Sequence, residues 1–306
     1  MKKKNLTLEQ QLAIYKKRFT FVSILSFVII ASLLFYIYLN YNFLAFKHLI
    51  SNHYMYTKTL DDLFRKELGI DANGKYYLYF DNLAISIITK RIREENNDRY
   101  TYLYTPQALK KSMQEEKEDA LKSELKILNE KTVYMRLTNF SKYTKDFVLN
   151  NIAILQKHPF IIIDLRDNYG GDVFAMAAMA DVFLPKGKII AVDRMRMFNW
   201  TYKSKKDQKL KFNKIIILQN KNTASAAENF TVSLKDNLEN VLTIGEKTFG
   251  KGIGQFTLPL RQGYAVKATV MKWFSPKNYN IHGVGIAADI FYTGEDIIDF
   301  SLKQLP

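Results

Sequence analysis

The segment Asn222-Thr223-Ala224-Ser225-Ala226-Ala227-Glu228 stands between a run with strand character, Lys214–Asn220, and a predicted helix from Ala226 to about Leu238. A hydroxyl-bearing turn between a buried strand and a helix start can present a nucleophile. A helix N-terminus also favours developing negative charge. The alternative is that Ser225 only caps the helix, and on this segment alone a cap is the more common outcome.

Strands and helices alternate on both sides of this segment. The run Phe160–Leu165 is continuously apolar, which is typical of a strand in a sheet covered on both faces. Helices are predicted at Tyr143–Leu155 and Asp172–Phe183. The other predicted strands are Val133–Leu137, Ile189–Val192, Leu242–Gly245, Gly254–Leu258, Tyr264–Phe274 and Ile290–Tyr292. This alternation predicts an α/β fold in which a parallel or mixed sheet carries helices on its faces.

An uncharged apolar segment, residues 19–46, lies near the N-terminus and exceeds the roughly 20 residues needed to cross a bilayer as a helix. Residues 1–18 before it are basic. The positive-inside rule therefore predicts a cytoplasmic tail at 1–18, a transmembrane signal anchor at 19–46 and an extracytoplasmic remainder, with the plasma membrane as location. A cleaved signal peptide is the alternative, but the run is long for one and no small-x-small cleavage site follows it.

Residues 47–109 are expected to form a helical N-terminal region. Helices are predicted at 47–70 and at about Leu78–Glu95, with a turn at Asp71–Gly74 between them. A third helix should begin at Thr105-Pro106, because proline is favoured at the first helical position. The heavily charged residues 110–131 predict a solvated helix or linker.

The composition excludes several kinds of site. The 306 residues include no cysteine, so disulfides, thiolate zinc sites and a cysteine nucleophile are excluded. No cluster of His, Asp or Glu has the spacing of metal ligands, and we expect neither a metal nor a cofactor. The formal net charge of +15 fits nucleic acid or an anionic membrane or wall surface. We expect no nucleic acid, because no binding motif is present and the predicted location is outside the cell.

A serine nucleophile needs a base. The chain has four histidines, His48, His53, His158 and His282. None of them stands in a recognisable triad order with a carboxylate. A neutral lysine can act as base if burial lowers its pKa. Lys251 is framed by Gly250 and Gly252, which allow the backbone to pack tightly around it, and it is therefore the candidate base.

Three segments, Asp164–Gly171, Asn222–Glu228 and Ile244–Gly252, read D-L-R-D-N-Y-G-G, N-T-A-S-A-A-E and I-G-E-K-T-F-G-K-G. In order and spacing they resemble the D-L-R-x-N-x-G-G, G-S-A-S-A-S-E and G-E-x-T-F-G-K-G motifs of the S41 family of C-terminal processing (tail-specific) peptidases. The resemblance covers about residues 133–292. Asp98–Pro106 also resembles the D-P-Y-S-x-Y-L-T-P connection of that family.

The resemblance implies a ClpP/crotonase-like core, an S41-like catalytic domain at 132–306, and a membrane-anchored extracytoplasmic serine endopeptidase. Ser225 falls on the nucleophile, Lys251 on the general base, and Gln255 on the residue that orients the lysine. Such a Ser-Lys dyad cleaves polypeptides through an acyl-enzyme, and the substrates would include envelope or secreted proteins. The backbone donors of the oxyanion hole fall on Gly170, Gly171 and Ala226. A homo-oligomer is left open.

Family members usually carry a PDZ domain where this chain has only residues 110–131, which are too few for that fold. The alternative function is a catalytically silent S41-like peptide-binding or scaffold module at the cell surface, which would hold extended peptides at a strand edge. The presence of Ser225, Lys251 and Gln255 together favours the enzyme. Asp236 matches an acidic position of the family and is expected to be structural.

Overall fold

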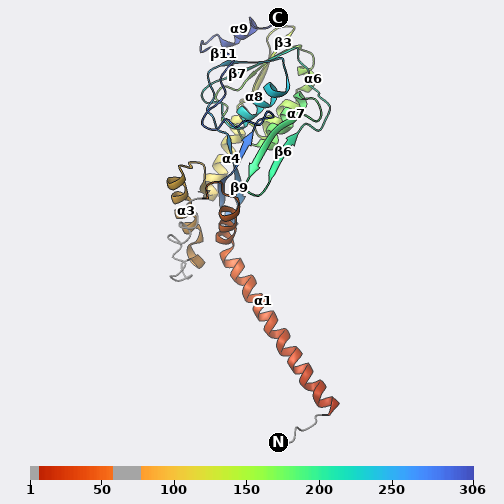
Figure 1. The fold of residues 1–306 in the computed structure, drawn as a ribbon, viewed down its shortest axis with the longest axis vertical. Coiled ribbons are helices and arrows are strands. Elements are labelled where there is room, and N and C mark those ends of the chain that lie inside the picture. Colours follow the sequence, from red (N-terminus) through yellow and green to blue (C-terminus); the bar gives the residue numbers. More distant parts are fainter. Residues whose placement is uncertain (1–6, 58–76) are drawn as a thin grey trace.

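The computed structural model describes residues 7–57 and 77–306. A long helix, α1 (Leu8–His53), projects from the rest of the chain, whose helices and strands gather around two β-sheets (Figure 1). The expected α/β fold is therefore confirmed, but the strands form two sheets instead of one.

The larger sheet has six strands in the order β11-β8-β7-β4-β3-β2. Its strands are β2 (Glu124–Ile127), β3 (Thr132–Arg136), β4 (Phe160–Asp164), β7 (Lys214–Gln219), β8 (Val241–Gly245) and β11 (Ile290–Phe291). All neighbours pair in parallel except the edge strand β2, which runs antiparallel to β3. Every residue of β4 is buried, as expected for a strand covered on both faces.

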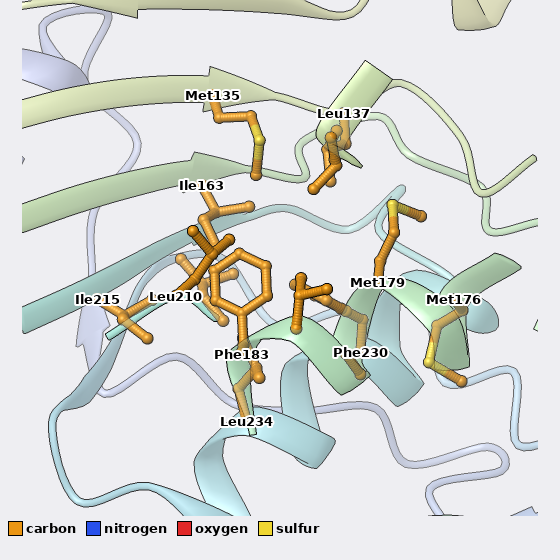
Figure 2. Packing of buried hydrophobic residues seen from close by; sticks show 14 of the residues in the cluster. Met135, Leu137, Ile163, Met176, Met179, Phe183, Leu210, Ile215, Phe230 and Leu234 are labelled. Carbon is orange, nitrogen blue, oxygen red and sulfur yellow. The ribbon is translucent and has the colours of Figure 1, made fainter. Parts of the chain in front are cut away.

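The main core lies on one face of this sheet, under the helices α5 (Lys142–Asn150), α7 (Val173–Phe183) and α8 (Ala226–Asn237). Figure 2 shows Phe183 and Phe230 at its centre, and their rings meet edge to face at 5.8 Å. The single helix expected at Tyr143–Leu155 is interrupted at Asn151, after which a short α6 (Ile152–Leu155) follows. On the other face, the strands pack against α9 (Ile297–Leu302).

The smaller sheet is antiparallel throughout. Its strands are β1 (Tyr102–Tyr104), β5 (Ile189–Met195), β6 (Asn199–Lys203), β9 (Ile253–Pro259) and β10 (Ala265–Phe274). The long strand β10 pairs with β1, β5 and β9. A 3-10 turn, η1 (Arg261–Gly263), joins β9 to β10. Through β9, this sheet is connected directly to the loop that carries Lys251.

The N-terminal region confirms some expectations and corrects others. Helices α3 (Tyr77–Asn96) and α4 (Pro106–Ala120) are present, and the Thr105 side chain caps α4. The helix expected at 47–70 ends at His53; the rest of it beyond residue 57, and the turn at Asp71–Gly74, lie outside the described residues. Residues 110–131 are not only a helix or linker, because Glu124–Ile127 forms the edge strand β2.

Helix α1 has two different environments along its length. Every residue from Leu8 to Leu39 is exposed, and α1 is long and apolar enough to cross a membrane. From Asn40 onward it packs against α3 and β10, burying Phe46 and Ile50, and the Asn42 side chain binds Asn82. The segment free to face lipid thus ends near residue 39, earlier than the expected 46, and residues 19–39 would span about 30 Å.

Candidate active site

The three sequence motifs follow the carboxyl ends of three adjacent parallel strands, β4, β7 and β8. Carboxyl ends of parallel strands share one edge of a sheet, so the motifs meet there. Ala224 N–H donates to the carbonyl of Asn168 at 2.9 Å, which joins the first motif to the second. Phe249 N–H donates to the carbonyl of Thr223 at 3.0 Å, which joins the third. The segments that resemble the family therefore form one site.

Ser225 stands at the sharp turn between β7 and α8. Its backbone has φ 56° and ψ −118°, a left-handed conformation that costs a residue with a side chain about 1–3 kcal/mol. A strained strand–turn–helix is the way a nucleophilic serine is presented at the top of a sheet. Ser225 lines a cleft of about 520 Å³, together with Lys251, Gly171 and Ala226.

Glu228, one helical turn after Ser225, holds the second and third motifs together. Its fully buried carboxylate accepts hydrogen bonds from Ser225 N–H, Gly250 N–H and Lys251 N–H at 2.7–2.8 Å, and from the Thr248 hydroxyl at 2.5 Å. This role of Glu228 was not predicted. The signal was present, because Ser-x-x-Glu at a helix start is the spacing of a capping box.

Glu228→Gln is expected to lower both stability and activity. The four donors bind the two oxygens of the carboxylate, whereas an amide has only one acceptor oxygen. Burial raises the pKa of Glu228 and the four hydrogen bonds counteract it, so the site is arranged for an acceptor. We expect the free energy of unfolding to fall by about 2 kcal/mol or more. Thermal unfolding and kcat/KM should be measured together. Glu246→Gln in the same loop is the control, since its side chain accepts no hydrogen bond within the described ranges; equal effects in both variants would contradict this role.

Lys251 is partly buried, and its ammonium lies 4.4 Å from the centre of the Tyr100 ring. Its carbonyl accepts a hydrogen bond from Trp273 Nε1 at 2.9 Å, which anchors the loop on β10. Burial, followed by the positive charges of Lys267 and Arg99, lowers the pKa of Lys251 to about 8. A useful fraction of the amine is therefore neutral near neutral pH, as a general base requires.

Ser225 Oγ and Lys251 Nζ share the cleft, but no hydrogen bond joins them in the described part of the chain. Hydrogen bonds of catalytic groups are often long before substrate binds. The expected contact between Gln255 and Lys251 is not formed either, because Gln255 Nε2 donates instead to Thr269 Oγ1 at 3.4 Å. Tyr100, from the connection Asp98–Pro106, contacts the Lys251 ammonium instead, a contact that was not predicted.

The predicted oxyanion donors differ in whether their N–H groups are already used in this structure. Gly171 and Ala226 line the cleft, and their N–H groups donate to no acceptor among the residues that the structure describes. The N–H of Gly170 is already used, because it donates to Asn168 Oδ1 at 2.9 Å. Gly171 and Ala226 therefore remain the predicted oxyanion donors, while the Gly170 N–H already has an acceptor.

Gly170 matters for a steric reason, which predicts the effect of Gly170→Ala. A Cβ there would lie 2.7–2.8 Å from Ala224 O, Ala226 N and Ser225 Cβ, and φ is +97°. We expect the backbone strain to lower the free energy of unfolding by about 1–2 kcal/mol, and the steric clash to lower it further. Because the clash displaces Ser225, kcat/KM should also fall. Gly187→Ala is the matched control, since φ there is +87° with no atom within 4 Å. Equal unfolding free energies and equal kcat/KM for the two variants would contradict the prediction.

The remaining candidates lie outside the cleft. Asp236 accepts hydrogen bonds from Lys277 N–H and the Tyr279 hydroxyl at 3.1 and 3.3 Å, which agrees with the structural role expected for it. His158 Nδ1 lies 3.0 Å from the Ile154 carbonyl. Within residues 7–57 and 77–306, no group of three His, Asp or Glu side chains is placed to hold a metal ion.

Comparison with known proteins gives the site its context. The model of Peptidase family S41 matches residues 131–292. A probable CtpA-like serine protease of Staphylococcus epidermidis is 37% identical over 149 residues, which are 45% of this chain and 29% of that protein. The match thus spans less than a third of that relative's length.

Two solved structures illustrate the likeness in three dimensions. A photosystem II D1 C-terminal processing protease is 27% identical with a TM-score of 0.48, over 54% of this chain and 43% of that one. A lipoprotein from Streptococcus agalactiae is 18% identical with a TM-score of 0.66, over 87% of this chain and 95% of that one. At 18% identity the second comparison shows a similar fold and nothing more. The similarity in fold covers more of the chain than the region matched by the family model.

Proposed function

The chain belongs to peptidase family S41, and on that premise we propose that it is a membrane-anchored serine endopeptidase with a Ser225–Lys251 dyad. The observation that carries the proposal is the cleft. One strained serine, one lysine of lowered pKa and two backbone N–H groups that bind no acceptor among the described residues line the same space. This is the set of groups that acyl transfer needs, namely a nucleophile, a base and oxyanion donors.

In the proposed reaction the neutral amine of Lys251 accepts the proton of Ser225 Oγ as this oxygen attacks the scissile carbonyl. The N–H groups of Gly171 and Ala226 then bind the negative oxygen of the tetrahedral intermediate, which can lower the barrier by a few kcal/mol. Lys251 returns the proton to the leaving amine, and Ser225 is left acylated. The same amine, neutral again, takes a proton from the water that attacks the acyl carbonyl. As the bond between the acyl carbon and Ser225 Oγ breaks, Lys251 gives this proton to Oγ, so the acid product leaves and both residues return to their starting states.

The anchor in this proposal is the exposed part of α1, about residues 19–39. The basic residues before it favour a cytoplasmic N-terminus and an extracytoplasmic cleft. Helix α1 runs without interruption from this segment to His53, and its C-terminal part is packed into the domain. The catalytic domain would therefore sit close to the membrane surface in a limited range of orientations.

The polypeptide substrate would enter the cleft without a PDZ domain between α4 and the larger sheet. After α4 the chain passes directly into β2, the edge strand of that sheet. The alternative, a catalytically silent module, would use the same cleft to bind peptides without cutting them.

The test uses the full chain in detergent micelles with an unfolded protein as substrate, and new termini are read by mass spectrometry. New termini that appear with the purified chain and are lost when Ser225 is replaced support the peptidase; binding without new termini supports the silent module. The anchor is tested separately in cells, by carbonate extraction and by external protease. Release of the chain by carbonate, or protection of the domain in intact cells, would overturn the proposed location.

A further inference from the structure

The lining of the cleft includes a buried carboxylate that the proposed chemistry does not use. Asp193, in β5, lines the cleft but is only 1% exposed. The Tyr202 hydroxyl donates to its Oδ2 at 3.0 Å. Its Oδ1 is buried without a hydrogen-bond partner within the described ranges, and no Lys, Arg or His there forms an ion pair with it. An acid that borders a peptide-sized cleft thus has one buried oxygen that no described group binds.

The sheet register places this carboxylate on the same side as the proposed catalytic groups. Asp193 lies directly opposite Trp273 of β10, so the two side chains project from the same face of the sheet. Trp273 also lines the cleft, and its indole binds the carbonyl of Lys251. Asn229, one turn after Ser225 on α8, lines the cleft as well. A substrate carbonyl held at Ser225 would therefore bring a neighbouring side chain toward Asp193.

An unpaired buried carboxylate is unfavourable, and natural proteins compensate nearly all of them. Burial raises the pKa of Asp193 to about 6, so the group still carries its charge at neutral pH and above. The hydrogen bond from the Tyr202 hydroxyl links β6 to β5, but it leaves Asp193 Oδ1 without a donor. A cation supplied by a ligand would complete the site.

The other charged residues of the cleft already have neighbours of opposite charge or a structural role. Lys267 lies close enough to Glu116 for its positive charge to favour the charged form of that carboxyl. The same charge disfavours the protonated form of Lys251. Asp172 caps α7 by accepting hydrogen bonds from Phe174 N–H and Ala175 N–H. Asp193 differs from them because, in the part of the chain that the structure describes, no cationic side chain pairs with it and one of its oxygens accepts no hydrogen bond.

We propose that Asp193 determines specificity by receiving the cationic side chain of a lysine or arginine beside the scissile bond. The inference rests on the proposed peptidase function of the cleft. The apolar surfaces of Val173, Met271 and Trp273 line the same space and suit the methylene stem of such a side chain.

The test compares peptides that are identical except for one residue, which is lysine, arginine, norleucine or glutamate. This variable residue is placed in turn at each position on both sides of the cut. With the full chain in micelles, we expect kcat/KM for the lysine or arginine peptide to exceed that for norleucine by about tenfold or more at one position. Asp193→Asn keeps the shape and an acceptor for Tyr202, and the preference should shrink to about twofold or less. Asp236→Asn, at a partly buried acid outside the cleft, should keep the full preference.

A second measurement separates this inference from the proposed chemistry. Binding of fluorescent lysine and norleucine peptides to Ser225→Ala reports recognition without turnover. One outcome supports the inference while the proposed function fails. In that outcome no Ser225-dependent cleavage occurs, Ser225→Ala binds the lysine peptide more tightly than the norleucine peptide, and the double variant Ser225→Ala, Asp193→Asn shows no such preference. Cleavage or binding without a cationic preference, or an Asp193→Asn variant that loses all peptides equally, overturns the inference.

Discussion

Ser225→Ala is expected to lower kcat/KM for polypeptide cleavage by at least about a thousandfold, because no other group can form the acyl-enzyme. The fold should not change, since the substitution removes only the Oγ atom and leaves the backbone strain at φ 56° the same. The measurement is the initial rate of peptide cleavage by the full chain in micelles. A slowly hydrolysed peptide ester should also leave its acyl group on Ser225 of the parent, which mass spectrometry of the intact chain detects.

The control for this variant is Ser233→Ala on the same helix. Ser233 is buried outside the cleft, where its hydroxyl donates to the carbonyls of Ile190 and Asn229 at 2.6 Å. Its loss should cost about 1 kcal/mol of stability and leave the acylation step in place. If Ser225→Ala cleaves at the parent's rate, or if the acyl group is found on another residue, the assignment of the nucleophile is wrong.

The sequence was sufficient for the features that depend on local pattern. The strands β4 and β7 are isoleucine-rich runs because both faces of the larger sheet are covered, and such runs are visible without knowing their neighbours. The convergence of the motifs also follows from order alone, since each motif follows a strand and adjacent parallel strands end at one edge. Ser225 and Lys251 share a cleft for this reason.

The features that depend on contacts between distant residues could not be predicted. Glu228 binds the loop around Gly250 and Lys251, and Tyr100 covers the Lys251 ammonium from a strand connection about 150 positions earlier. Asp193 reaches the cleft only through the register of β5 against β10. Antiparallel pairing of distant strands leaves no periodic signal in the sequence that would fix this register.

The anchor boundary shows a different limit. Hydropathy does not distinguish a helix that faces lipid from one that packs against protein, so the uncharged run was assigned as a whole to the membrane. The signal that could have shortened it was polar, because Asn40 and Asn42 interrupt the run. Asn42 Oδ1 accepts from Arg261 N–H at 2.7 Å, a contact that belongs to the folded domain.

Activity is expected to rise with pH around a midpoint of about 8, because the amine of Lys251 must be neutral to accept the serine proton. Below its pKa the amine is protonated and cannot act as base, so log kcat/KM should climb with a slope near one and level off above the midpoint. Lys251→Arg should be inactive at every pH tested, since a guanidinium does not deprotonate in this range. Lys247→Arg, an exposed position in the same loop, is the control and should keep the parent profile.

The cause of the lowered pKa supplies a sharper test of the same assignment. After burial, the largest contribution comes from the positive charge of Lys267. Lys267→Met removes that charge, so the protonated form of Lys251 becomes less unfavourable and its pKa rises. The midpoint of the activity profile should therefore move to higher pH, while the plateau above it stays within a few-fold of the parent. A midpoint that does not move, or that moves to lower pH, would show that the titrating group in the profile is not Lys251. It would then have to be sought among the other titratable groups of the cleft, of which Asp193 is the first to replace.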